Sequence, residues 1–167
     1  MNYKIRKKER KDCVGIARVI TVAWNETYRG IVSDEFLDSL YINEEVRAQN
    51  SYNNFNKKEN HQYVLEINNE VVGFIKVGEA NVTEYDNCGE IYALYIINKY
   101  KGYGFGKKLI EAGIKELKLM NFDKMVIGCL EGNPSNNFYK HIGGKFIKTR
   151  IFENLQLLEN VYYFEKI

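Results

Sequence analysis

Apolar residues recur at helical spacing in the first third of the chain. Steps of three and four separate the apolar side chains of residues 13–27, and Asp12 precedes them as a candidate N-cap, which predicts a helix. Ser33 is placed to cap a second, short helix. Residues 43–60 are polar and Asn-rich with weak periodicity, so a helix and a loop are equally open there, and Tyr3–Arg6 predicts a short first strand.

Runs of β-branched and aromatic residues then predict strands. Gln62–Ile67 and Val71–Val77 flank Asn68-Asn69, which predicts a hairpin around a tight turn. The apolar run Ile91–Ile97, which Glu90 precedes, predicts a buried central strand over Glu90–Ile97. Three further segments complete the expected strands: Lys124–Leu130, Lys145–Ile151 and Val161–Glu165.

Two helices are predicted between these later strands. The first begins near Gly106 and has one apolar stripe at steps of three and four, and the second covers Ser135–His141. The resulting order β-α-α-β-β-β-α-β-α-β-β predicts an α/β fold, a mixed sheet with helices on both faces. The strands Glu90–Ile97 and Lys124–Leu130 are expected side by side and parallel, within one domain that covers residues 1–167.

Composition excludes several classes of protein. The net charge is only +2, so nucleic acid is not an expected partner. The basic cluster Lys4–Lys11 favours a solvated edge strand over a docking patch. Cys13, Cys88 and Cys129 are scattered and odd in number, which with no signal peptide indicates reduced thiols in a cytoplasm. No apolar run has the length of a membrane span, and the histidines and cysteines lack the spacing of a metal site.

The segment around the end of the central strand has the order strand, glycine loop, helix, which is typical of an anion-binding site. Gly102, Gly104 and Gly106 stand between that strand and the following helix, where free backbone amides and the helix dipole favour a phosphate. The spacing excludes two common nucleotide motifs. A P-loop needs four residues between its outer glycines, and a dinucleotide fingerprint needs a different glycine pattern.

Lys101-Gly-Tyr-Gly-Phe-Gly106 resembles instead the Gln/Arg-x-x-Gly-x-Gly/Ala loop of the GNAT superfamily of N-acetyltransferases, and Asn133–Tyr139 is similar to that family's second cofactor motif. The resemblance implies a GNAT-like fold, with a mixed, mostly antiparallel sheet and a splayed parallel strand pair. It also implies acetyl-CoA as cofactor. The cofactor-binding residues that it implies are Leu94, Tyr95, Ile96, Lys101, Gly102, Tyr103, Gly104, Phe105, Gly106, Lys107, Asn133, Asn136 and Tyr139.

The resemblance further implies chemistry for particular residues. Backbone amides at Tyr95 or Ile96 would hold the developing oxyanion, and the Tyr139 hydroxyl would protonate the leaving sulfur. Glu90 matches a position where some members keep a general base acting through water. The alternatives are structural: Tyr139 as a packing aromatic, and Glu90 as a surface glutamate at a strand end.

The expected reaction is direct acetyl transfer in a ternary complex to a primary amine, with a small molecule or a polyamine favoured. Candidate acceptor contacts are Tyr28, Arg29, Asp34 and Glu35. Acidic residues would suit a polyamine and Arg29 would suit an acceptor that carries a carboxylate, so both remain open. The alternatives are a peptide or protein N-acetyltransferase and a non-catalytic CoA-binding regulatory module. A monomer or a homodimer is expected.

Overall fold

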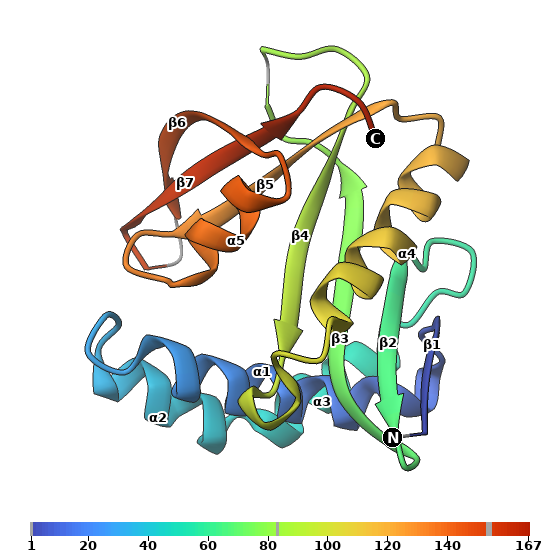
Figure 1. The fold of residues 1–167 in the computed structure, drawn as a ribbon. Coiled ribbons are helices and arrows are strands. Elements are labelled where there is room, and N and C mark those ends of the chain that lie inside the picture. The colour runs from blue at the N-terminus through green and yellow to red at the C-terminus, as the bar shows by residue number, and fades with distance from the viewer. Residues whose placement is uncertain (1, 83, 153–154) are drawn as a thin grey trace. The chain divides into compact units, whose positions relative to one another are not determined.

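The computed structural model describes residues 2–82, 84–152 and 155–167. Its strands form a seven-stranded sheet in the order β1-β2-β3-β4-β5-β7-β6 (Figure 1). In chain order the elements are β1 (Tyr3–Lys7), the 3-10 turn η1 (Arg10–Asp12), α1 (Cys13–Tyr28), α2 (Asp34–Ile42), α3 (Glu44–Asn53), β2 (Gln62–Ile67), β3 (Glu70–Glu79), β4 (Cys88–Ile96), η2 (Asn98–Tyr100), α4 (Phe105–Leu119), β5 (Lys124–Leu130), α5 (Ser135–His141), β6 (Lys145–Phe152) and β7 (Leu157–Phe164).

The chain divides into two compact units, each made of two segments. The first unit comprises Met1–Lys76 and Ala93–Gly113, and the second comprises Val77–Tyr92 and Ile114–Ile167. The strands β3 and β4 and the helix α4 pass from one unit to the other.

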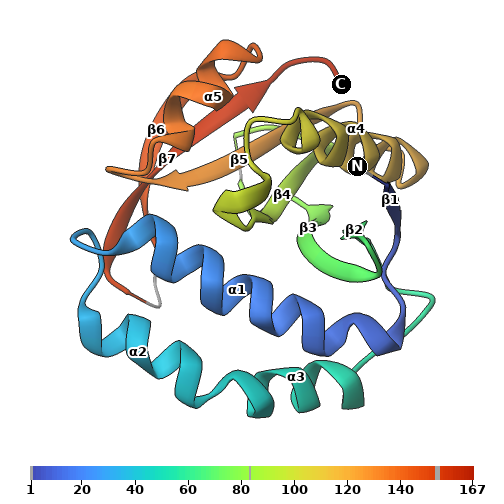
Figure 2. The ribbon, with the colours of Figure 1, turned by 60° about the horizontal axis from the view of Figure 1, so that its bottom comes forward.

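In the first unit, β1, β2 and β3 pair antiparallel, and the predicted hairpin is confirmed. Asn68 and Asn69 make its turn with positive φ angles of 50° and 66°, a conformation that asparagine tolerates better than most residues. Helix α1 packs on this sheet through a buried cluster that includes Val19, Val64 and Phe74. Figure 2 shows α2 and α3 beside α1.

The N-terminal helices agree with the sequence in most respects. Ser33 caps α2 by accepting a hydrogen bond from the Phe36 amide at 3.3 Å, as expected. The open question over residues 43–60 is resolved by α3, whose one buried residue is Ala48. Val14 was expected on the buried stripe of α1 but is 68% exposed, because α1 turns that side away from the cluster around Val19.

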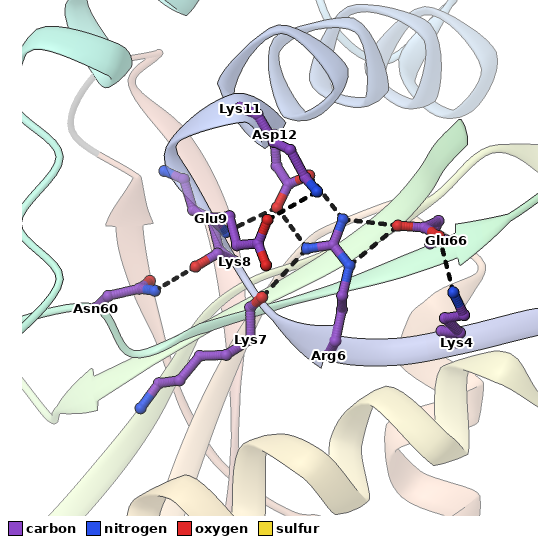
Figure 3. Close-up of polar contacts among 9 residues, drawn as sticks. All are labelled: Lys4, Arg6, Lys7, Lys8, Glu9, Lys11, Asp12, Asn60 and Glu66. Carbon is purple, nitrogen blue, oxygen red and sulfur yellow. Dashed lines mark hydrogen bonds and ion pairs between the residues drawn. The ribbon is translucent and has the colours of Figure 1, made fainter. Parts of the chain in front are cut away.

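Strand β1 is fastened to its surroundings by Arg6 (Figure 3). The guanidinium donates to both carboxylate oxygens of Asp12, at 2.7 and 2.9 Å, and to Glu66 on β2 at 2.7 Å. Asp12 does stand at the N-cap position of α1, but its side chain makes no cap bond to that helix. Its Oδ2 accepts instead from the Glu9 amide at 2.7 Å, so the carboxylate stabilises η1 and β1.

The second unit contains the parallel pair that the sequence predicts. Cys88–Ile91 of β4 pairs in parallel with Lys124–Ile127 of β5. The parallel ladder ends at Ile91 and Ile127, although β4 runs on to Ile96 and β5 to Leu130. Antiparallel pairing of β5 with β7 and of β7 with β6 completes this unit, and α5 packs on β5 and β7 (Figure 1).

The described part of the chain lacks two kinds of feature, a membrane-spanning helix and a cluster of metal ligands. None of its helices combines the length and the apolar character needed to span a bilayer. No group of three or more His, Cys, Asp or Glu side chains there is arranged to hold a metal ion.

Candidate functional site

The glycine loop lies in the first unit, between η2 and the start of α4. Gly102 and Gly104 have φ angles of 84° and 79°, in the left-handed region that other residues rarely adopt. A Cβ atom at either position would meet no protein atom within 4 Å. The protein therefore requires glycine there for backbone conformation, and the space above both residues is open to a ligand.

The loop exposes a run of unpaired backbone donors. Within the described residues, the amides from Gly102 to Lys107 have no hydrogen-bond acceptor, and the first helical bond is that of Lys108 to the Gly104 carbonyl at 3.3 Å. We call these donors the open amides. The last three, Phe105–Lys107, belong to the first turn of α4, where the helix dipole adds positive potential, and the others directly precede it. This arrangement suits an anion with several oxygens, such as a diphosphate.

The aromatic residues of the loop have different environments. Phe105 is buried and packs edge-on against Tyr3 of β1, with ring centroids 5.0 Å apart, so it fixes the start of α4. Tyr103 is exposed. Of the lysines, Lys108 lies over the Tyr3 ring at 5.6 Å, and desolvation lowers the pKa of Lys101 while Glu26 opposes that change.

The end of β4 is tightly packed against β3 and α1 in the same unit. A Cβ atom on Gly73 of β3 would lie 2.9 Å from the Tyr95 carbonyl oxygen, so β3 must have glycine at this point. The Tyr95 ring packs against Phe74 at 5.6 Å and Trp24 at 6.2 Å. Leu94, Tyr95 and Ile96, the predicted strand end, are therefore held by a close backbone contact and by aromatic packing.

The second predicted cofactor motif lies in the second unit, at the start of α5. Asn133 Oδ1 accepts from the Ser135 amide at 2.8 Å, which caps the beginning of that helix. Tyr139 is buried, with its ring 5.5 Å from that of Phe138 and 6.1 Å from that of Tyr162. Both residues thus help to fix the same short helix.

Asn136 has a full set of protein partners. Its Nδ2 donates to the carbonyls of Leu130 and Asn133 at 2.9 and 2.8 Å, and its Oδ1 accepts from Tyr162 at 2.7 Å and Asn160 at 3.1 Å. These contacts use both donors and both acceptor positions of the amide. The geometry favours a role in fastening α5 to β5 and β7 over direct cofactor contact.

Glu90 is buried in the second unit, with 4% exposure, and both of its carboxylate oxygens have partners. Arg150 of β6 pairs with Oε1, and the Asn81 amide donates to Oε2 at 3.3 Å. Arg150 also donates to Glu159 of β7 at 2.6 Å. Burial opposes the charge of Arg150, but the bonds to the two carboxylates raise its pKa overall.

Arg150 and Glu159 are not among the residues predicted from the sequence. The sequence feature that could have identified them is a pair of opposite charges in the closing hairpin, where Arg150 lies opposite Glu159 in the strand register. The predicted last strand began at Val161, whereas β7 begins at Leu157 and so includes Glu159. The ion pairs also explain Gly128 of β5, since a Cβ there would lie 2.3 Å from Glu159 Oε2.

The candidate acceptor residues lie at the end of α1 and the start of α2, in the first unit. Tyr28 is the last residue of α1 and is buried against Trp24, with ring centroids 4.6 Å apart. Arg29 pairs with Asp34 at 2.9 Å and with Asp38 at 2.6 Å. Asp38 was missed, although it follows Asp34 at a helical spacing of four.

The same cluster includes Asn25, and Glu35 stands apart from it. Arg29 donates to Asn25 Oδ1 at 2.6 Å, and Asn25 Nδ2 donates to the Leu37 carbonyl at 3.1 Å, so α1 and α2 are joined at this end. Glu35 is exposed and, within the described residues, has no ion-pair or hydrogen-bond partner from its side chain.

The three cysteines are buried and unoxidised, and their surroundings do not favour a reactive thiolate. Burial raises the pKa of Cys88 to about 11 and that of Cys129 to about 12. Both thiols are therefore protonated at neutral pH and are poor nucleophiles.

Comparisons with known proteins agree with this geometry. Residues 21–143 match the model of the Acetyltransferase (GNAT) family. A Bacillus subtilis (strain 168) protein named as the uncharacterized N-acetyltransferase YuaI is 27% identical over 142 residues, 81% of this chain and 76% of that protein. An N-alpha-acetyltransferase of Sulfurisphaera tokodaii is 27% identical over 95 residues, 52% of this chain and 57% of that protein.

A solved structure shares the fold. The PaiA N-acetyltransferase of Thermoplasma acidophilum, in complex with coenzyme A, has a TM-score of 0.73 at 20% sequence identity. The match covers 98% of this chain and 100% of that chain.

Proposed function

The chain belongs to the acetyltransferase (GNAT) family, and on that premise we propose that it acetylates a primary amine of a small molecule or polyamine by direct attack in a ternary complex. Membership in the family, together with the named N-acetyltransferase relatives, makes it an acyl-CoA-dependent N-acetyltransferase that uses acetyl-CoA. The acceptor, the mechanism and the residues that perform it are the parts that we propose.

The open amides from Gly102 to Lys107 carry the proposal for the cofactor site. They would bind the diphosphate of acetyl-CoA, because they are free donors at a helix N-terminus and no Cβ covers Gly102 or Gly104. Lys101 and Lys107 would add positive charge beside them. When bound, acetyl-CoA supplies an activated thioester and a thiol leaving group.

Two groups would act at the reacting atoms. Backbone amides at the end of β4, at Tyr95 or Ile96, would stabilise the oxyanion, an effect worth about 3 kcal/mol in other enzymes. The Tyr139 hydroxyl would donate a proton to the leaving sulfur, and Asn133 would bind the pantetheine arm. The fixed position of α5, held by Asn136, supports such roles because proton transfer needs a precisely held donor.

Glu90 has contacts that support a structural role more strongly than that of a general base. Both of its oxygens have partners within the protein, Arg150 and the Asn81 amide, and these contacts hold the carboxylate in place between two strands and a loop. We therefore propose that Glu90 joins β4 to β6 through Arg150, and that the amine loses its proton to solvent.

The electrostatics near the end of α1 support a cationic acceptor. The Arg29 guanidinium already donates to Asp34, Asp38 and Asn25, so its charge is balanced within the protein by two carboxylates. Two aspartates against one arginine leave excess negative charge there, and exposed Glu35 adds to it. This balance favours a polyamine over an amino acid.

A peptide or protein acceptor is the second candidate. It is supported by the similarity to the S. tokodaii protein named as an N-alpha-acetyltransferase. The third candidate, a CoA-binding module without turnover, would retain the open amides and lack transfer.

Release of free thiol from acetyl-CoA, measured with polyamines, small monoamines, amino acids and N-terminal peptides, tests the proposal. We expect the highest kcat/KM with a polyamine. Preference for a peptide would replace the first candidate with the second. Binding of CoA by calorimetry without thiol release on any acceptor would support the third.

A further inference from the structure

The last turn of α1 contacts the segment that leads into the glycine loop. Glu26 Oε2 accepts a hydrogen bond from the Asn98 amide at 2.7 Å. Asn98 is the first residue of η2, and Ile97, its N-cap, provides no side-chain cap of its own. The amide would otherwise be an orphan donor at the start of a helical turn, so a carboxylate from α1 caps η2 from outside.

This contact completes a well-fixed stretch of backbone. The Ile97 amide donates to the Val72 carbonyl at 3.0 Å, and the amides of Tyr100 and Lys101 donate to the carbonyls of Ile97 and Asn98 at 2.9 and 3.0 Å. The open amides begin with the very next residue, Gly102. The hydrogen-bonded backbone is therefore followed directly by amides without acceptors, and among the described residues Glu26 supplies the one side-chain hydrogen bond to the backbone amides of residues 97–101.

Helix α1 holds the end of β4 in a second way. The ring of Trp24 lies 6.2 Å from that of Tyr95, just before η2. Trp24 is buried and Glu26 is exposed, so the first contact belongs to the core and the second to the surface. Loss of the Glu26 contact should therefore change the loop without unfolding the helix.

We propose that Glu26 is a positioning residue for the cofactor loop: its bond to the Asn98 amide sets the direction in which the chain enters Gly102–Lys107. The inference rests on the proposed binding of the diphosphate by the open amides. Pre-set donors bind an anion more tightly than donors that must be ordered on binding.

The charge of Glu26 gives the inference a discriminating test. A carboxylate near a phosphate site weakens phosphate binding by repulsion, so charge alone predicts that both Glu26→Gln and Glu26→Ala strengthen CoA binding. Positioning predicts a different result. Glu26→Gln keeps an oxygen acceptor for Asn98, whereas Glu26→Ala removes it.

The experiment measures the Kd of CoA by calorimetry together with KM and kcat for acetyl-CoA. For Glu26→Ala we expect Kd and KM to rise about fivefold, as for the loss of one hydrogen bond, with kcat within about twofold of wild type. Glu26→Gln should stay within about twofold in all three. A fall in kcat and Tm at constant KM would indicate a merely structural role and overturn the inference.

Removing the Asn98 amide hydrogen provides an independent test of the same bond. Proline at position 98 deletes the amide hydrogen, and Ile97 has φ −58° and ψ 135°, a conformation that suits a residue before proline. Asn98→Pro should weaken CoA binding, and in the Glu26→Ala background it should add little further loss, because both changes break the same bond. Fully additive losses would contradict the proposal.

Two controls separate this inference from the proposed function. Glu111→Ala removes an exposed carboxylate of α4 and should leave the Kd unchanged. Gly104→Asp should abolish CoA binding if the open amides form the site. If Gly104→Asp abolishes binding and Glu26→Ala does not weaken it, positioning by Glu26 is wrong and the cofactor site stands. Unaltered binding by Gly104→Asp would overturn the site itself.

Discussion

Arg150 of β6 forms an ion pair with Glu90 of β4, sixty residues away in the sequence. Glu159 of β7 engages the same guanidinium, so one cation joins three strands of the second unit. The residue that the family resemblance nominated as a general base is thus part of a buried ionic network. Its chemistry has to be tested against that contact.

Glu90→Gln tests which role dominates. If Glu90 is structural, the variant should keep at least about a third of wild-type kcat with an unchanged pH-rate profile, because the amide still accepts from Asn81. The free energy of unfolding should fall by about 3 kcal/mol, since a buried pair is broken. A loss of kcat of about a hundredfold or more, with a changed acidic limb of the profile, would restore the general base.

Gly104→Asp should abolish CoA binding, as measured by calorimetry. A side chain at this position covers the open amides, its charge repels phosphate, and the φ of 79° strains any residue other than glycine. Gly143→Ala is a matched control, because Gly143 also has a positive φ of 102° and open space around it. That control should lose stability without losing CoA affinity.

Tyr139→Phe should lower kcat about a hundredfold and leave KM for acetyl-CoA nearly unchanged, because it removes only a proton donor. Steady-state kinetics with the best acceptor measures both. Tyr162→Phe is the control: it loses a hydrogen bond to Asn136 at 2.7 Å, so it should cost about 1 kcal/mol of stability with little effect on kcat. Full activity of Tyr139→Phe would exclude the acid role.

Because of Asp12, the free energy of unfolding should depend on pH in the acidic range. Burial opposes its charged form, but the bonds from Arg6 and the Glu9 amide lower its pKa below the ordinary 3.8. The folded state therefore binds this proton less readily than the unfolded state does. The contribution is present above the unfolded pKa and is lost as pH falls through the lower, folded one.

Denaturant unfolding at several pH values measures this effect. Asp12→Asn should lose about 2 kcal/mol at pH 7, and the difference from wild type should shrink below about pH 4. Asp86→Asn, at an exposed position, should follow the wild-type curve. A constant difference between Asp12→Asn and wild type across the whole range would contradict the assignment.

Much of the fold could be predicted because its elements have strong local signals. The predicted bounds of β2, β5 and α5 coincide with the observed ones, since turn or breaker residues such as Asn68 and Gly143 flank them. Helix α3 could not be decided from its pattern. It has a single buried residue, Ala48, and therefore almost no apolar periodicity to read.

The site was predictable where it depends on the backbone, and less so where it depends on tertiary contacts. The glycine pattern identified the open amides because positive φ angles and free donors are local properties. The partner of Glu90 was hidden, because Arg150 reaches it only through pairing of distant strands.

The basic N-terminal cluster lies on an edge strand, β1, and its charges can protect that edge from pairing with another molecule. β1 pairs only with β2 and stands first in the sheet, so its outer backbone groups are a template on which another chain could add a strand. Lys4 and Lys7 project from this exposed strand, and repulsion between such charges opposes stacking of one molecule on the next. Replacing both with threonine should therefore promote fibril formation at high concentration without altering acetyl transfer.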